Sequence, residues 1–327
     1  MKFRIRTSFG LGNSQALQIC KNLSTLSLQK NEELVFDFTD YIENNPLSNL
    51  LLINSLKQCK KRFPDNKMSI IPKANDSYLP HIGFYQTIGI DFGKQPGEAT
   101  ASSSYVPISK VPLSGQDFYS NIESKSLQLA HTIQYEDELS KTLSYMFTET
   151  IRNSFEHTTE KEVLVAAQRW PSFNLLEIAI ADSGCGIIGS LGTRYNAKEE
   201  KLLELACKPG ISAKSNYSFL DEDSQWRNSG YGLYILKELA LAYHGYFVLC
   251  SGKHALLYQY DDGTILERFV ETNYFGTAIG LRLKTDLAKN FEEVLQNIVQ
   301  RGQKEAESIE GAIRLASKSS GGRYILV

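Results

Sequence analysis

Two polar residues stand one helical turn apart in the segment FTETIRNSFEHT, residues 147–158, and together they could act on a phosphate group. Glu149 could orient and deprotonate a water molecule or a hydroxyl group. Asn153 could offer an uncharged oxygen to Mg²⁺, which prefers few protein ligands beside phosphate and water. A helical projection places both residues at the edge of an apolar stripe. The alternative interpretation is a solvated helix face with no part in chemistry.

A second group of candidate residues lies in the segment EIAIADSGCGI, residues 177–187. Asp182 follows an alternating strand, and its carboxylate could accept a hydrogen bond from the exocyclic amine of adenine. Gly184 and Gly186 could let the backbone approach a flat ligand, because glycine tolerates positive φ angles. The alternative interpretation is an ordinary Asp-Gly turn.

Two further segments add candidate contacts. In NSGYGLYILKELALAYHGYF, residues 228–247, Gly230 and Gly232 precede a helix whose unpaired N–H groups would suit a phosphate. In FGTAIGLRL, residues 275–283, Thr277 is expected to open a strand and could bridge to a base through water. Each segment alone is a weak signal, since such glycines and threonines are common at these places.

Taken together and in this order, the four segments resemble the GHKL ATPase superfamily, which includes the histidine kinase-like and gyrase B-type ATP-binding domains. ETIRNSFEH is similar to the N box of that family, DSGCG to its first glycine box and SGYGLYILK to its second. ACKPGISAK, residues 206–214, is similar to a stretch of the ATP lid. The chain has no G-x-x-x-x-G-K-S/T motif, so a P-loop nucleotide site is not predicted.

The resemblance implies an ATP and Mg²⁺ site with a role for each matching residue. Glu149 is implied as the general base, Asn153 as the Mg²⁺ ligand and Asp182 as the acceptor for adenine. Glu156 stands where many kinases of the family carry a basic residue, so that phosphate contact would come from Arg152 or from a lysine of the lid. The residues implied as further nucleotide contacts are Gly184, Gly186, Ser212, Lys214, Gly230, Gly232, Leu233 and Thr277.

Residues 187–229 are expected to form the ATP lid. The segment is long and polar, and loops of this size are usually functional lids or disordered. Within it, residues 198–207 are expected to form a short helix. Residues 208–229 have few apolar side chains, so we expect them to become ordered only when a triphosphate offsets the entropy cost.

The elements before this domain alternate between strand and helix signals. Strands are predicted at residues 2–6, 33–39 and 67–72, and amphipathic helices at residues 14–26 and 47–63. The alternation predicts that residues 1–95 form a small α/β domain, and this region resembles the STAS fold of anti-anti-sigma factors. Residues 96–116 are rich in Gly, Pro and Ser and are expected to be a linker.

The larger domain is expected to span residues 117–285. The pattern predicts an α+β two-layer sandwich, the Bergerat fold of GHKL domains, with its helices on one face of a mixed sheet. The predicted helices are residues 137–158 and 232–244, and the predicted strands are residues 161–170, 173–182, 245–252, 255–262 and 277–284. Residues 286–327 are expected to form a C-terminal helical extension.

Two uses of ATP remain open. In the first, the protein is an ATPase switch whose lid and C-terminal helices change contacts with a protein partner, in a bacterial regulatory or phage-defence system. In the second, it is a serine/threonine kinase of the anti-sigma-factor type, acting on a separate STAS-type partner. Ser48 is expected to cap a helix rather than to accept phosphate in cis. A homodimer is compatible with either use.

Composition sets the broad class of the protein. Of its 327 residues, 42% are hydrophobic and 22% are charged, as in a globular protein with a sizeable core. The net charge of −2 gives no strong field toward nucleic acid or an anionic membrane. The apolar runs are too short to span a bilayer, and the five scattered cysteines argue against a disulfide framework. We therefore expect a cytoplasmic protein.

Overall fold

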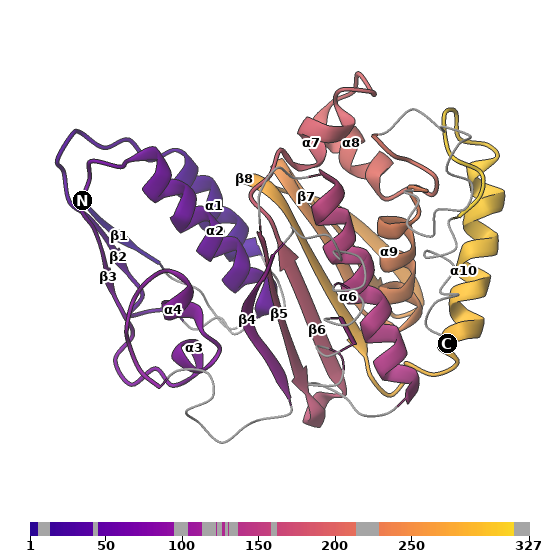
Figure 1. Cartoon of the computed structure of the whole chain (residues 1–327), viewed down its shortest axis with the longest axis horizontal. Helices are drawn as coiled ribbons and strands as arrows, with labels where there is room; N and C mark the ends of the chain where they lie inside the picture. Colours follow the sequence, from indigo (N-terminus) through magenta and orange to yellow (C-terminus); the bar gives the residue numbers. More distant parts are fainter. Residues whose placement is uncertain are drawn as a thin grey trace.

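The protein is built from stacked layers of sheet and helix (Figure 1). The computed structural model describes residues 1–5, 14–41, 45–94, 104–112, 122, 126–127, 130, 137–157, 162–213 and 229–316. Within these ranges, no side chain is described at positions 14, 112, 137–139 and 152–157. A three-stranded sheet, a helix pair, a five-stranded sheet and a second group of helices follow one another across the molecule.

The N-terminal unit has the alternating order that its sequence predicts. Its elements are β1 (Lys2–Arg4), α1 (Ser14–Ser24), β2 (Leu34–Asp37), α2 (Pro46–Arg62) and β3 (Met68–Ile71). The strands form a parallel sheet in the order β1-β2-β3. Both helices lie on one face of this sheet, as two right-handed crossovers in the same direction require (Figure 1). Two short helices, α3 (Tyr78–His81) and α4 (Phe84–Thr87), complete the unit.

The second sheet is antiparallel at every pairing between its described strands, so the prediction of a mixed sheet is wrong. Its order is β4-β5-β6-β8-β7. The strands are β4 (Tyr105–Pro112), β5 (Glu162–Trp170), β6 (Leu175–Ala181), β7 (Tyr246–Asp261) and β8 (Thr264–Lys284). Strand β4 lies inside residues 96–116, where the composition predicted a linker. Strands β7 and β8 form one long hairpin that merges and extends the shorter strands predicted there.

One face of this sheet, called the front face below, carries the helices that the larger domain was expected to contain. They are α6 (Asp137–His157), α7 (Gly186–Leu191), α8 (Glu199–Ala206), α9 (Gly232–Ala242) and α10 (Phe291–Ala306). Helices α6 and α9 pack side by side, and α10 lies outside them (Figure 1). Alternate residues of β6, namely Leu176, Ile178 and Ile180, belong to this front core.

The opposite face, called the back face, is also covered, which corrects the expectation of helices on one face only. Helices α1 and α2 pack onto it from the N-terminal unit (Figure 1). Several sheet residues there are small, among them Ala179, Ala278 and Gly280. A Cβ atom added to Gly280 would lie 2.5 Å from Cδ2 of Leu47 on α2, so the helix approaches the strand closely. Burial on both faces explains why the β6 segment LLEIAIA is apolar at every position except Glu177.

A buried polar network joins α2 to the back face. Glu177, Arg282 and Tyr246 lie beside one another across β6, β8 and β7. Glu177 Oε1 accepts hydrogen bonds from Arg282 Nε at 2.7 Å and from the Tyr246 hydroxyl at 2.8 Å. The same oxygen accepts from Asn45 Nδ2 at 3.0 Å. Burial raises the pKa of the Glu177 carboxyl, and the charge of Arg282 opposes that rise.

Asn45 is also the residue that caps α2. Its side chain accepts a hydrogen bond from the backbone N–H of Ser48 at 3.2 Å. The expectation that Ser48 itself caps the helix is therefore wrong. Ser48 lies inside α2 with an exposed fraction of 0%, so its hydroxyl is closed to a kinase in this structure.

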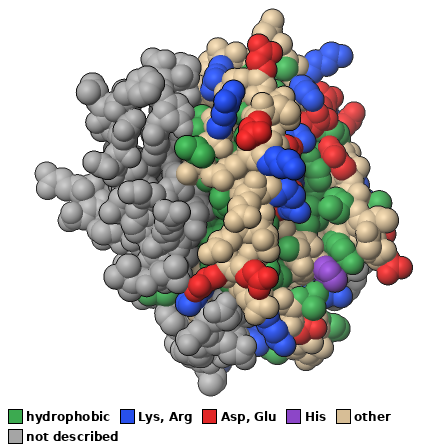
Figure 2. Space-filling view, turned by 90° about the vertical axis from the view of Figure 1, so that its right-hand side faces the viewer, with side chains coloured by type: hydrophobic (Ala, Val, Ile, Leu, Met, Phe, Trp, Pro, Cys, Tyr) green, Lys and Arg blue, Asp and Glu red, His purple; other side chains and the backbone are tan. Residues whose placement is uncertain are grey.

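The outer surface around α10 mixes both signs of charge. Lys and Arg side chains alternate with Asp and Glu side chains on the side of the molecule shown in Figure 2. Helix α10 confirms the predicted C-terminal helix over residues 291–306, and residues 307–316 continue without a further helix. Residues 317–327 lie outside the described part. Among the helices that are described, none is long and apolar enough to cross a membrane.

Candidate functional site

Asp182 lies immediately after β6, between the two faces of the sheet. Its backbone N–H donates to the Thr277 carbonyl oxygen at 2.9 Å, which continues the pairing with β8. Its Oδ1 accepts hydrogen bonds from the backbone N–H groups of Gly184 at 2.8 Å and Thr277 at 3.2 Å. The residue is 3% exposed. The structure thus brings together Asp182, Gly184 and Thr277, three of the residues predicted from the sequence.

The backbone of Asp182 is held from the other side by residues that sequence reasoning missed. Its carbonyl oxygen accepts hydrogen bonds from Asn54 Nδ2 at 3.3 Å and from the Tyr274 hydroxyl at 3.2 Å. Asn54 Nδ2 also donates to the Tyr274 hydroxyl oxygen at 2.7 Å. A signal was present in the sequence, because Asn54 interrupts the apolar run LLLINSL and a buried amide needs partners.

The glycines near Asp182 serve the close approach of backbone segments. Gly186 has a φ of +70°, and an added Cβ would lie 2.7 Å from the Gly276 carbonyl oxygen. Gly276 has a φ of +108°, and its Cβ would lie 2.2 Å from the Asp182 carbonyl oxygen. Ser251 completes the turn, since its hydroxyl donates to Gly276 O at 2.8 Å and accepts from Ile187 N at 3.0 Å. Thr277 follows inside β8, so the expectation that it opens a strand is wrong.

A second cluster forms where the predicted lid leaves and re-enters the domain. Gly210 N donates to Gly230 O at 3.1 Å, which places residues on both sides of positions 214–228 next to each other. Gly230 has a φ of +70°, and its Cβ would lie 2.4 Å from the Ile211 carbonyl oxygen. Ser212 is buried there, and its carbonyl oxygen accepts from Arg194 Nη1 at 2.7 Å. Lys214 lies outside the described residues.

The start of α9 adjoins this cluster. Gly232 and Leu233 are the first residues of the helix, and the first N–H groups of an α-helix lack partners within it. Within residues 187–229, α8 confirms the predicted short helix. The expectation about ordering of residues 208–229 falls mostly on positions outside the described part.

The C-terminal segment after α10 packs against the same cluster, which the sequence did not indicate. Ile313 N donates to Gly210 O at 2.8 Å, and the Tyr231 hydroxyl donates to Arg314 O at 2.8 Å. Arg194 Nη2 donates to Gly311 O at 3.0 Å. Residues 311–314 therefore help to fix the base of the predicted lid.

Glu149 is buried on α6, with an exposed fraction of 1%. Its neighbours in the predicted apolar stripe, Leu143, Phe147 and Ile151, are each 0% exposed. The alternative of a solvated helix face is therefore wrong for Glu149. A buried carboxylate is costly unless it is hydrogen-bonded or paired, so Glu149 is not part of a solvated surface stripe.

The remaining N-box residues cannot be placed at the level of side chains. Asn153 lies one turn after Glu149 on α6, and its side chain falls outside the described atoms, as do those of Arg152 and Glu156. No group of three His, Cys, Asp or Glu residues that could hold a metal ion occurs among the described residues. A Mg²⁺ ion bound mainly through phosphate and water does not need such a group, so the role of Asn153 stays a prediction.

These clusters are carried by elements that pack against one another. Helix α6 contacts α7, α9 and β6, while α9 contacts β7 and β8. Asp182 has the side-chain direction of Ile178 and Ile180, which face α6 and α9, because side chains alternate along a strand. The carboxylate of Asp182, the buried Glu149 and the start of α9 thus belong to the front face.

A scan against protein-family models finds no match, and a search of curated proteins finds no relative.

Proposed function

We propose that the front face binds an adenine nucleotide together with Mg²⁺, in the manner of the GHKL ATPases that the motifs resemble. The observation that carries the proposal is the Asp182 carboxylate, which is 3% exposed and anchored by the N–H groups of Gly184 and Thr277. This anchoring leaves the carboxylate in a fixed position to accept a hydrogen bond from the adenine amine. The N–H groups at the start of α9 suit the phosphates.

In this proposal, each residue has one role in ATP hydrolysis. Asn153 is the residue that would hold Mg²⁺, and the bound ion would supply positive charge to neutralise the phosphates. Glu149 takes the proton from the attacking water, a role that suits a buried carboxylate because burial favours the protonated product. The lid of residues 187–229, anchored at Gly210 and Gly230, couples the bound nucleotide to contacts with a protein partner.

Calorimetry with a non-hydrolysable ATP analogue and Mg²⁺ tests the nucleotide site. Asp182→Asn retains an acceptor oxygen for Gly184 and Thr277, so we expect the fold to survive. The loss of a hydrogen bond to a charged group costs about 1.5–3 kcal/mol, which corresponds to a roughly 10–150-fold weaker affinity. Asp261→Asn is the matched control, because Asp261 is an exposed carboxylate at the end of β7. An affinity that is equal in the parent and in Asp182→Asn contradicts the proposal, as does absence of binding in the parent.

The fate of the terminal phosphate separates the two uses of ATP. With γ-labelled ATP, a hydrolase releases the label as inorganic phosphate, whereas a kinase of the anti-sigma-factor type transfers it to a STAS-type protein. Burial of Ser48 in α2 argues against transfer within the chain. We therefore expect label in solution when the protein is assayed alone. Label on the chain itself would contradict hydrolysis as its main activity.

A further inference from the structure

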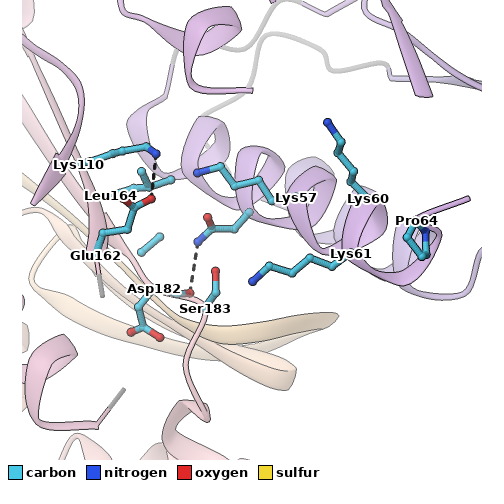
Figure 3. A pocket seen from close by; sticks show the side chains of 11 residues that line it. Lys57, Lys60, Lys61, Pro64, Lys110, Glu162, Leu164, Asp182 and Ser183 are labelled. Carbon is cyan, nitrogen blue, oxygen red and sulfur yellow. Dashed lines mark hydrogen bonds and ion pairs between the residues drawn. The ribbon is translucent and has the colours of Figure 1, made fainter. Parts of the chain in front are cut away.

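A cavity of about 560 Å³ lies on the back face, between α2 and the strands β4, β5 and β6 (Figure 3). Its lining includes four lysines: Lys57, Lys60, Lys61 and Lys110. Three of them come from the C-terminal half of α2, and Lys110 comes from β4. Ser183 and Asn54 add polar groups at its floor. The cavity is therefore rich in groups that carry or donate positive charge.

The lysines differ in where their ammonium groups point. In Figure 3, Lys57 and Lys110 point toward Glu162, and Lys61 points toward Ser183, while Lys60 points away from the others. Lys110 Nζ forms an ion pair with Glu162 Oε1 at 3.1 Å. Two ammonium groups thus face the Glu162 carboxylate, while that of Lys61 faces the Ser183 hydroxyl (Figure 3).

The acidic residues of the lining do not balance this charge. Asp182 borders the cavity, but its carboxylate points to the other side of the strand (Figure 3). Glu162 forms an ion pair with Lys110, and Lys57 points toward the same carboxylate (Figure 3). The outer surface near α10 shows the contrast, because both signs of charge are mixed there (Figure 2).

Lys57 is the lysine whose charged form is disfavoured in this arrangement. It is half-buried, and among the described residues it forms no ion pair within 4.0 Å. Burial lowers the pKa of Lys57, and the nearby charge of Lys110 lowers it further, while Glu162 opposes the change. An anion placed between these ammonium groups would remove the repulsion and favour their charged forms.

We propose that this cavity binds a small oligophosphate anion through Lys57, Lys61 and Lys110, at a site separate from the nucleotide site on the front face. Its volume falls within the range of about 300–1,000 Å³ that is usual for small-molecule sites. Lysine binds phosphate as a point charge, and the half-buried Lys57 is screened less by salt than the exposed Lys61 and Lys110. The Ser183 hydroxyl is the neutral donor closest to Lys61 in this lining (Figure 3). The proposal goes beyond ATP binding and does not depend on it.

Titration of the full chain with inorganic pyrophosphate at constant ionic strength tests the cavity. We expect saturable binding at one site in the parent protein. Lys57→Ala and Lys61→Ala should each weaken it about tenfold or more, since each removes a charged hydrogen-bond donor. Lys60→Ala is the matched control on the same helix, and we expect less than about a twofold change because its ammonium group points away.

A variant with the opposite sign keeps the test decisive if a lysine variant fails to fold. Glu162→Gln removes the carboxylate that competes for Lys110, so pyrophosphate should bind several-fold more tightly. Misfolding cannot mimic a gain of affinity. Two results would overturn the proposal: no saturable binding in the parent, or equal losses in Lys57→Ala and Lys60→Ala.

Discussion

The two faces of strand β6 carry side chains of different size. On the front face, large side chains such as Ile178 and Ile180 pack against helices that carry a buried carboxylate, Glu149. On the back face, Ala179 and Ala181 are small and let α2 come close. In the proposal above, the front face positions side chains for chemistry, while on the back face Asn54 of α2 holds the backbone of Asp182. Asp182 belongs to both, through its carboxylate on the front and its carbonyl oxygen on the back.

The largest expected effect is on turnover, and it tests the front face. Glu149→Gln keeps the shape of the side chain but removes the base, so ATP hydrolysis should fall by about 10²–10⁴-fold. The affinity for the ATP analogue should stay within about threefold, because Glu149 acts on the attacking water rather than on the nucleotide. Steady-state hydrolysis and calorimetry measure the two quantities.

Glu238→Gln is the control for this variant, since Glu238 lies on α9 and pairs with Arg301 at the surface. It should hydrolyse ATP at the parent rate. If Glu149→Gln also keeps the parent rate, the base lies elsewhere and the front face loses its proposed chemistry.

The second prediction tests the back face and concerns stability. Arg282→Ala leaves Glu177 buried without its cation, and breaking a buried pair in this way costs about 3–5 kcal/mol. The free energy of unfolding, measured in urea, should fall by that amount. Arg301→Ala is the matched control, because Arg301 is 62% exposed in its pair with Glu238. Its loss should be about 0–1 kcal/mol.

The loss in Arg282→Ala should also depend on pH. Burial raises the pKa of Glu177 above its ordinary value of 4.5, and the variant lacks the charge that opposes this rise. The folded state then holds a proton that the unfolded state has released, so stability falls as the pH rises through that window. The destabilisation relative to the parent should be larger at about pH 8 than at about pH 5. A loss that is equal at both values would show that Glu177 is not the group left uncompensated.

The smallest expected effect tests whether the two faces communicate. Asn54→Ala removes the hydrogen bond from α2 to the Asp182 carbonyl oxygen, a contact worth about 0.5–1.5 kcal/mol. We expect the ATP analogue to bind up to about tenfold more weakly, although Asn54 lies on the back face. Gln58→Ala, one turn further along α2, is the control and should leave the affinity unchanged. Equal affinities in the parent and in Asn54→Ala would mean that the faces act independently.

Local patterns predicted most elements of the fold. The helices α1, α2, α6 and α9 and the strands of the N-terminal unit follow from periodicity, which is a property of neighbouring residues. Periodicity could not predict that α2 covers the back face, because α2 and β6 are more than a hundred residues apart in the sequence. Strand β6 was predicted from its alternation, and that local pattern does not identify α2 as the partner on the back face.

The residues of the candidate site also fall into two groups: those that a local sequence pattern could predict and those that come from distant segments. The turn from Asp182 to Gly184 is local, so its residues could be proposed from spacing alone. Asn54 and Tyr274 reach Asp182 from distant segments and gave no joint pattern. The lysines at the end of α2 read as an ordinary basic helix terminus, which the helix dipole favours. They line a cavity because the fold places Lys110 of β4 beside them, which the sequence pattern does not indicate.

The packing of α1 has a consequence for the order in which the chain can fold. Thr272 on β8 donates a hydrogen bond to the Leu17 carbonyl oxygen at 2.9 Å, and the two residues are 255 positions apart. Helix α1 therefore packs against β8, which is synthesised last among the described strands of the five-stranded sheet. Contacts so distant in sequence reward the chain only after the entropy of closing the intervening loop has been lost. Until β8 emerges, the nascent N-terminal unit must keep the apolar face of α1 without this native cover, and no fragment that ends before β8 can supply it.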